Sequence, residues 1–207
     1  MMEQIDKLKE HEQTDPIRLE EIKTMLIKDN FQRDPIIVDK KTLVVVDGHH
    51  RLNALKQLGH KRVAVYYINY LEDKNIIVHT WYPIILGSRR KLMKLVNEKF
   101  INLNSDSKQS PHGELVVKDK IYSLKSGRES IMRTLVGKVR IDYAFTIEIA
   151  RDLAFKGKVA GALIFKSVSK RDVINAALSG KKFPPKTTQN IIPNKPRNWY
   201  VSLKKLS

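Results

Sequence analysis

The chain has 207 residues, of which 42% are hydrophobic, enough for the core of one large domain or of one domain with a smaller lobe. Lysine and arginine number 39 against 22 acidic residues, and the resulting formal net charge of +17 indicates either a polyanionic partner, such as nucleic acid or nucleotide phosphates, or simply a lysine-rich solvated surface. There is no cysteine, which excludes disulfides, zinc fingers and thiol chemistry.

The apolar runs and the start of the chain carry no membrane signal. No run reaches the roughly 18 apolar residues of a membrane span, and the start at Met1-Met2-Glu3-Gln4 lacks the features of a signal peptide. We therefore expect a soluble, cytoplasmic protein without a membrane partner.

Apolar spacing in the first hundred residues predicts an α+β unit. Residues 16–29 have helical spacing, and the β-branched runs at 35–38 and 43–46 predict a hairpin. A helix is expected from His49 to Gly59, where glycine suits the position after the last turn. The remaining elements are strands at 62–68 and 76–82 and a basic helix at 89–100. We assign residues 1–100 to an N-terminal domain.

The second half, residues 101–207, is expected to form a smaller α/β lobe. It begins with a polar loop at 102–113, and Ser169 with Asp172 forms a capping-box pattern before its last helix. The predicted elements are a hairpin at 114–117 and 120–124, helices at 129–136, 147–156 and 170–178, and strands at 141–146 and 159–165.

The segment Asp47-Gly48-His49-His50-Arg51 lies where a predicted strand ends and a helix begins. Such a junction offers an anion backbone N–H groups and the positive end of the helix dipole, while Gly48 permits close approach and Arg51 adds a guanidinium. Asp47 could hold Mg²⁺ or orient a hydroxyl. The alternative is a plain turn followed by a buried histidine. Two histidines and an arginine in the first helical turn favour a nucleotide-phosphate site.

This segment also carries a family resemblance. Val46-Asp47-Gly48-His49-His50-Arg51, followed by Ala54-Leu55 and Leu58-Gly59, resembles the signature of the ParB/sulfiredoxin superfamily. That resemblance implies a ParB/sulfiredoxin-like nucleotide-binding domain over residues 1–100. The sulfiredoxin branch has a catalytic cysteine in this turn, so sulfiredoxin activity is excluded here.

Within the superfamily the chain is most similar to the archaeal free L-serine kinases, which make O-phosphoserine from serine with ADP as donor. Four segments agree in order and span nearly the whole chain: His11-Glu12-Gln13, residues 47–51, Thr80-Trp81-Tyr82-Pro83 and Pro185-Lys186-Thr187-Thr188. The resemblance implies that the second lobe contributes a substrate-site loop at 184–190. It also implies a link to cysteine or serine metabolism.

The resemblance assigns each matched residue a role. Serine's hydroxyl is a poor nucleophile at neutral pH, so a carboxylate must take its proton, and Glu12 is the matched base. From sequence alone a solvated glutamate ahead of a helix is the better interpretation of Glu12, and only the matched family position favours a base; Trp81 could equally be a core aromatic. The expected site is catalytic Glu12 and Asp47, with Asp47 also the metal ligand, nucleotide-binding Gly48, His49, His50, Arg51 and Lys186, and substrate-binding Trp81, Thr187 and Thr188.

One departure from the family lies beside the two threonines. The archaeal kinases have an Arg-His pair where this chain has Gln189-Asn190, so a cationic contact is replaced by two amides. This puts in doubt the donor preference or the grip on the serine carboxylate, and Arg197, Lys186 or Lys195 could compensate.

Three functions follow as hypotheses. The first is a free L-serine kinase that uses Mg²⁺ and either ADP or ATP. The alternative is a ParB-like, nucleotide-switched DNA-binding protein, which the charge of +17 favours and the lack of a helix-turn-helix pattern after residue 89 disfavours. A weaker option is a regulator that binds nucleotide and amino acid without turnover. The sequence leaves open the donor, the acceptor range, the oligomeric state and whether Asp47 contacts metal or substrate.

Overall fold

The computed structural model describes residues 1–102 and 110–207 and divides into two compact units. The first unit comprises Met1–His79 and Val168–Ser207, and the second Thr80–Ser167. The boundary expected near residue 100 thus falls elsewhere, because the segment after residue 80 pairs within the second unit and the C-terminal segment packs in the first. Most of the loop expected at 102–113 lies outside the described residues. None of the described helices is long and apolar enough to cross a membrane.

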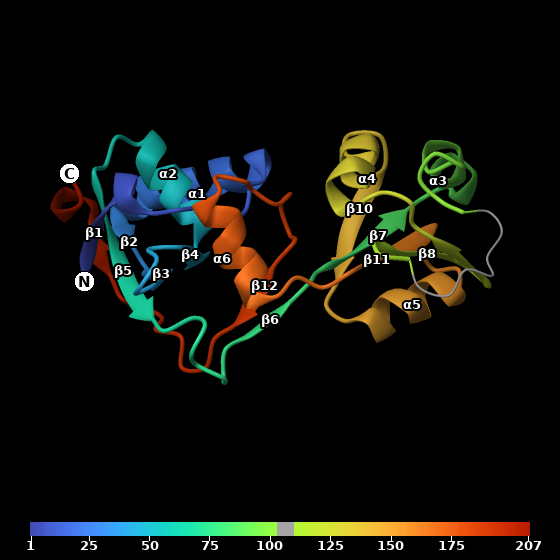
Figure 1. The fold of residues 1–207 in the computed structure, drawn as a ribbon. Coiled ribbons are helices and arrows are strands. Elements are labelled where there is room, and N and C mark those ends of the chain that lie inside the picture. The colour runs from blue at the N-terminus through green and yellow to red at the C-terminus, as the bar shows by residue number, and fades with distance from the viewer. Residues whose placement is uncertain (103–109) are drawn as a thin grey trace. The chain divides into compact units, whose positions relative to one another are not determined.

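A four-stranded sheet forms the centre of the first unit (Figure 1). Its order is β1 (Met2–Gln4), β5 (Arg62–Ile68), β3 (Ile36–Asp39) and β4 (Val45–Asp47). The predicted hairpin is confirmed as the antiparallel pair β3–β4, while β3 and β5 run parallel.

Helices cover both faces of this sheet, because successive apolar side chains of its strands point to opposite faces. Ile36, Val38 and Val45 pack with α1 (Pro16–Asp29) and α2 (His49–Gln57), whereas Ile37 and Val46 pack with α6 (Lys170–Leu178). The helix starts follow the local sequence. Asp15 caps α1, with Pro16 in its first turn, and the predicted capping box of Ser169 and Asp172 is present at α6.

Two short strand pairs and two 3-10 turns complete the first unit. The strand expected at 76–82 is interrupted at residues 80 and 81, because β6 (Ile77–His79) pairs with β12 (Gln189–Ile191), whereas β7 (Tyr82–Leu86) joins the sheet of the second unit. The other elements are β2 (Phe31–Gln32) paired with β13 (Val201–Ser202), η1 (Ile5–Lys7) and η2 (Leu203–Lys205).

The second unit is an antiparallel five-stranded sheet between helices (Figure 1). Its order is β10 (Arg140–Ala144), β7, β11 (Gly161–Phe165), β8 (Gly113–Val117) and β9 (Lys120–Ser123). One face packs with α3 (Arg89–Leu95) and α4 (Arg128–Leu135), the other with α5 (Ile147–Phe155). The basic helix thus ends at Leu95 instead of residue 100.

Candidate functional site

The predicted strand-to-helix junction is present and is built around Gly48. Strand β4 ends at Asp47, and Gly48 is the N-cap of α2 with φ +105°, a conformation that L side chains rarely adopt. A Cβ added to Gly48 would lie 3.0 Å from the Arg51 guanidinium and 3.3 Å from the Ile36 side chain. No side chain among the described residues caps α2, so its first-turn N–H groups are left for an anion.

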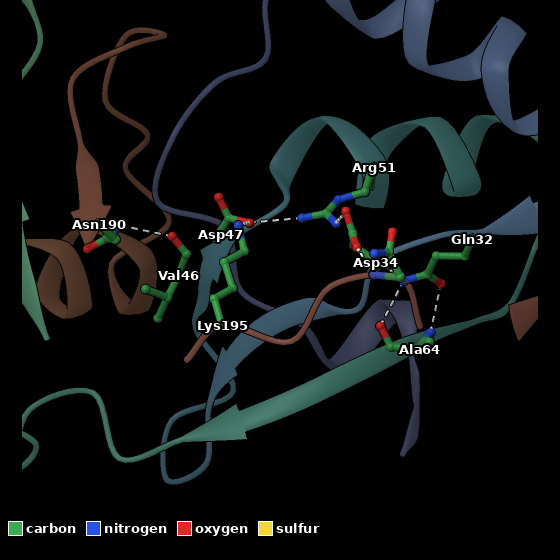
Figure 2. Close-up of polar contacts among 9 residues, drawn as sticks. Gln32, Asp34, Val46, Asp47, Arg51, Ala64, Asn190 and Lys195 are labelled. Carbon is green, nitrogen blue, oxygen red and sulfur yellow. Dashed lines mark hydrogen bonds and ion pairs between the residues drawn. The ribbon is translucent and has the colours of Figure 1, made fainter. Parts of the chain in front are cut away.

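Two cations meet on one oxygen of Asp47. Arg51 Nη2 lies 2.8 Å and Lys195 Nζ 2.6 Å from Asp47 Oδ2, and Arg51 also lies 3.7 Å from Asp34 (Figure 2). Burial works to raise the pKa of the Asp47 carboxyl, but Lys195 and Arg51 outweigh it and hold the pKa below its usual range. Asp47 is therefore ionised near neutral pH and positions both cations at the start of α2.

The two histidines of the segment are held below their ordinary pKa. Burial lowers the pKa of His49 to about 4, and burial also lowers the pKa of His50. His50 Nε2 accepts a hydrogen bond from the Asp15 backbone N–H at 3.0 Å. Both rings are therefore neutral near pH 7. The positive charges around the segment come from Arg51 and Lys195 on Asp47, from Lys182 near His49, and from Lys186 and Arg18 near His50.

The Pro-Lys-Thr-Thr segment folds around the carboxylate of Glu12. Glu12 Oε1 accepts from the Lys186 backbone N–H at 2.9 Å, and Oε2 accepts from the Thr188 backbone N–H at 2.8 Å and from the Thr188 hydroxyl at 2.6 Å. Thr187 is buried, and its hydroxyl donates to the Pro184 carbonyl at 2.7 Å, so it holds the turn together. Two motifs 174 residues apart are thereby brought to one place.

His11 links Glu12 to the start of α2. It is fully buried, its Nδ1 lies 2.8 Å from the Val45 carbonyl, and its Nε2 lies 3.1 Å from the Thr188 hydroxyl. Its ring meets the ring of His49 edge-on, with centroids 4.4 Å apart. Burial lowers the pKa of His11 to about 3. The Glu12 segment and the α2 cradle are therefore neighbours within one unit.

Trp81 belongs to the second unit. Its ring meets that of Phe145 edge-on at 5.7 Å between centroids, and its backbone carbonyl accepts from two Arg128 nitrogens at 3.1 Å each. Within this unit Trp81 lies beside an exposed phenylalanine instead of in the centre of the core.

Some residues of the site carry roles that the sequence did not assign. Asn190 has a structural role: its amide donates to the Val46 carbonyl at 2.9 Å (Figure 2) and its side-chain oxygen accepts from the Tyr70 hydroxyl at 2.6 Å. Lys195, considered only as a substitute cation, contacts Asp47 directly. His11 of the matched tripeptide received no role from the sequence, whereas in the structure it contacts Val45 and Thr188. The one sequence signal for Lys195 is the pair of prolines, Pro193 and Pro196, that stiffen its loop.

Known proteins resemble this chain over nearly its full length, although no family model matches it. It is 30% identical to an ATP-dependent L-serine kinase of Staphylothermus marinus, covering 98% of this chain and 89% of the relative. It is 26% identical to an ADP-dependent L-serine kinase of Thermococcus kodakarensis, covering 98% and 91%. A ParB-like protein of Sulfolobus acidocaldarius is 30% identical, covering 81% and 77%.

Solved structures agree with these relatives. Complexes of a free serine kinase with AMP and of its glutamate-to-alanine variant with ADP superimpose with TM-scores of 0.85 and 0.87 at 25% identity, covering 100% of this chain and 93% of theirs. These proteins thus share the mixed α+β architecture of this chain over nearly its full length. This chain therefore belongs to the L-serine kinase family of the ParB/sulfiredoxin superfamily.

Proposed function

We propose that this chain is a free L-serine kinase that transfers a phosphoryl group from ADP or ATP to the serine hydroxyl, giving O-phospho-L-serine. The observation that carries the proposal is the Glu12 carboxylate, held by the loop of Lys186 and Thr188 next to a helix start suited to phosphate. Relatives named for ATP and for ADP both support a nucleotide donor.

In the proposed reaction Glu12 takes the proton of the serine hydroxyl as the oxygen attacks the terminal phosphorus. The new bond joins serine oxygen to phosphorus, and the bond from phosphorus to the nucleotide oxygen breaks. Arg51, Lys195 and the first-turn N–H groups of α2 would stabilise the charge on the phosphate oxygens. Glu12 then releases the proton to solvent.

The other predicted residues have proposed supporting roles. Trp81, an aromatic of the second unit, stays a predicted serine-binding residue by the family resemblance, and Thr187 would keep the Pro184 turn rigid. Lys186 presents its backbone to Glu12, and its exposed side chain would reach the nucleotide phosphates. His49 and His50 would act as neutral hydrogen-bonding groups.

Magnesium would bind here together with the nucleotide, because the protein supplies few ligands of its own. No group of three or more histidine or acidic side chains among the described residues could hold a metal by itself. Mg²⁺ at phosphate sites typically takes one or two carboxylates, with phosphate oxygens and waters completing the shell. Asp47, an ionised carboxylate at the cradle, is the residue that would hold it, and the ion would supply charge neutralisation of the phosphates.

A panel of donors and acceptors tests the proposal. Purified protein with Mg²⁺ and either ADP or ATP is incubated with serine, threonine or homoserine, and phosphorylated amino acid is measured by ³¹P NMR. We expect phosphoserine with at least one donor. The absence of a phosphorylated product with every pair would refute the kinase.

A ParB-like nucleotide-switched DNA-binding protein is the second candidate, favoured by the charge of +17 and the ParB-like relative. Among the described residues α3 is followed by the β8–β9 hairpin instead of the further helices of a helix-turn-helix. The same preparation is therefore tested for duplex binding over a salt series. Steep salt dependence without phosphoserine would favour this candidate.

A further inference from the structure

The Thr188 hydroxyl lies between two acceptors. Its oxygen is 2.6 Å from Glu12 Oε2 and 3.1 Å from His11 Nε2. A threonine hydroxyl has one hydrogen to donate, so it serves one of these groups at a time. The shorter contact is to the carboxylate, as expected for a charge-assisted hydrogen bond.

The ring of His11 can only be an acceptor on the side of Thr188. Its Nδ1 lies 2.8 Å from the Val45 carbonyl, which accepts hydrogen bonds but cannot donate them, so Nδ1 carries the hydrogen. Complete burial keeps the ring neutral, with a pKa lowered to about 3. Nε2 therefore presents a lone pair to the Thr188 hydroxyl.

We infer that Thr188 and His11 form a hydrogen-bond switch that allows Glu12 to accept the proton of the substrate. The hydroxyl donates to Glu12 while Glu12 is ionised and rotates to His11 when Glu12 becomes protonated. No proton passes to His11; one hydroxyl hydrogen changes its acceptor. Thr188 and His11 are thus positioning residues, and the inference rests on the proposed function of Glu12 as the base.

The switch serves a base that must first be held in place and then neutralised. A hydroxyl fixed on the carboxylate would oppose its protonation, because hydrogen bonds to a charged group are lost or weakened when that group becomes neutral. The backbone N–H groups of Lys186 and Thr188 hold Glu12 throughout and cannot rotate away. The hydroxyl, by contrast, can rotate, and it has a second acceptor at hand in Nε2 of His11.

Other charged and titratable groups surround this pair. His49 of α2 faces the ring of His11, and Glu10 lies before it in the chain, ion-paired at 3.0 Å with Lys182. Lys186 follows on the loop that holds Glu12. All of these are the same in each variant below, so they cancel when variants are compared with the wild type.

The test measures kcat for phosphoserine formation against pH in two variants with opposite expected effects. Thr188→Val removes the hydroxyl and keeps the backbone contact, so ionised Glu12 loses one hydrogen-bond donor. The acidic limb of the kcat–pH profile should therefore move to higher pH by about one unit. His11→Asn keeps a donor for the Val45 carbonyl and removes the acceptor at Nε2, so the Thr188 hydroxyl stays on Glu12. The acidic limb of the kcat–pH profile should then move to lower pH, and kcat on the plateau should fall several-fold.

Two further variants separate the switch from a structural effect. Thr188→Ser retains the hydroxyl and is expected to return the acidic limb to its wild-type position. Thr134→Val removes a threonine hydroxyl in the second unit, where it donates to the Ser130 carbonyl at 3.2 Å, and is expected to leave the limb unmoved. Thermal unfolding of every variant shows whether it is folded.

The outcomes distinguish the switch from the kinase proposal. Limb shifts of opposite sign in Thr188→Val and His11→Asn support the switch. An unmoved limb in both, or shifts in the same direction, overturns it while the kinase stands. If the wild type forms no phosphoserine, the proposed function fails and the switch fails with it.

Discussion

At the scale of single residues, His11 and His49 are buried, neutral histidines. Burial lowers the pKa of His11 to about 3 and that of His49 to about 4, against an ordinary value near 6.5. In the unfolded chain both would gain a proton as the pH falls through about 6.5. The unfolded state then binds more protons than the folded state, so stability is full above this pH and declines as the pH falls towards 3.

His11→Asn tests this link between burial and stability. Each proton taken up only by the unfolded state lowers the free energy of unfolding by up to ~1.4 kcal/mol per pH unit. We expect the variant to be less stable than the wild type at pH 7.5 and to lose less stability than the wild type between pH 6.5 and 3.5. Urea unfolding at a series of pH values measures both. Parallel curves would show that His11 is not a neutral buried histidine.

The residues that meet around Glu12 show how far sequence reasoning reaches. Glu12 and Thr188 were identified through the family resemblance, but their hydrogen bonds join positions 176 apart and follow no local pattern. Lys195 was weighed only as a substitute for a missing cation, because the two prolines beside it do not reveal which carboxylate a single lysine of a basic chain contacts. Contacts of this kind depend on how the C-terminal segment returns to the first unit.

At the scale of elements, the turn from β4 into α2 depends on one glycine. Gly48 has φ +105°, and a Cβ there would meet the Arg51 guanidinium at 3.0 Å. Gly59, after the same helix, has φ +82°, and a Cβ there would meet nothing within 4 Å. An L side chain would therefore strain the backbone at either position, but only at Gly48 would it also press on the cradle.

Alanine at each glycine separates these effects. Gly48→Ala and Gly59→Ala should each cost about 1 kcal/mol of stability from the left-handed backbone. Only Gly48→Ala should also weaken nucleotide binding, by about tenfold or more, because Arg51 and the first-turn N–H groups must shift. Calorimetry with ADP measures the affinity, and urea unfolding the stability. Equal nucleotide affinity in the two variants would contradict the cradle.

Local periodicity predicted most elements, and long-range pairing limited the rest. The helix at 16–29, the β3–β4 hairpin and the capping box at Ser169 are confirmed, because each depends on residues close together in the chain. The single strand expected at 76–82 was wrong, because β6 and β7 pair with different sheets. Strand β12 was missed because its three residues pair only with the distant β6.

At the scale of the whole molecule, most of the basic residues that give the net charge are not the residues of the candidate site. The net charge of +17 is spread over 39 basic residues, whereas the cradle relies on Arg51 and Lys195 with neutral histidines beside them. The total charge thus says little about which anion binds. The α2 cradle and the Glu12 carboxylate lie in one unit built from both ends of the chain.

The most direct test of this account is the turnover of Glu12→Gln with the donor and serine that serve the wild type. Removing the base should lower kcat by about 100-fold or more, with nucleotide affinity little changed. Glu10→Gln is the matched control, since Glu10 lies in the same segment but contacts Lys182 and Asn53, and its turnover should stay within the wild-type order of magnitude. Phosphoserine formed by Glu12→Gln at the wild-type rate would contradict the account.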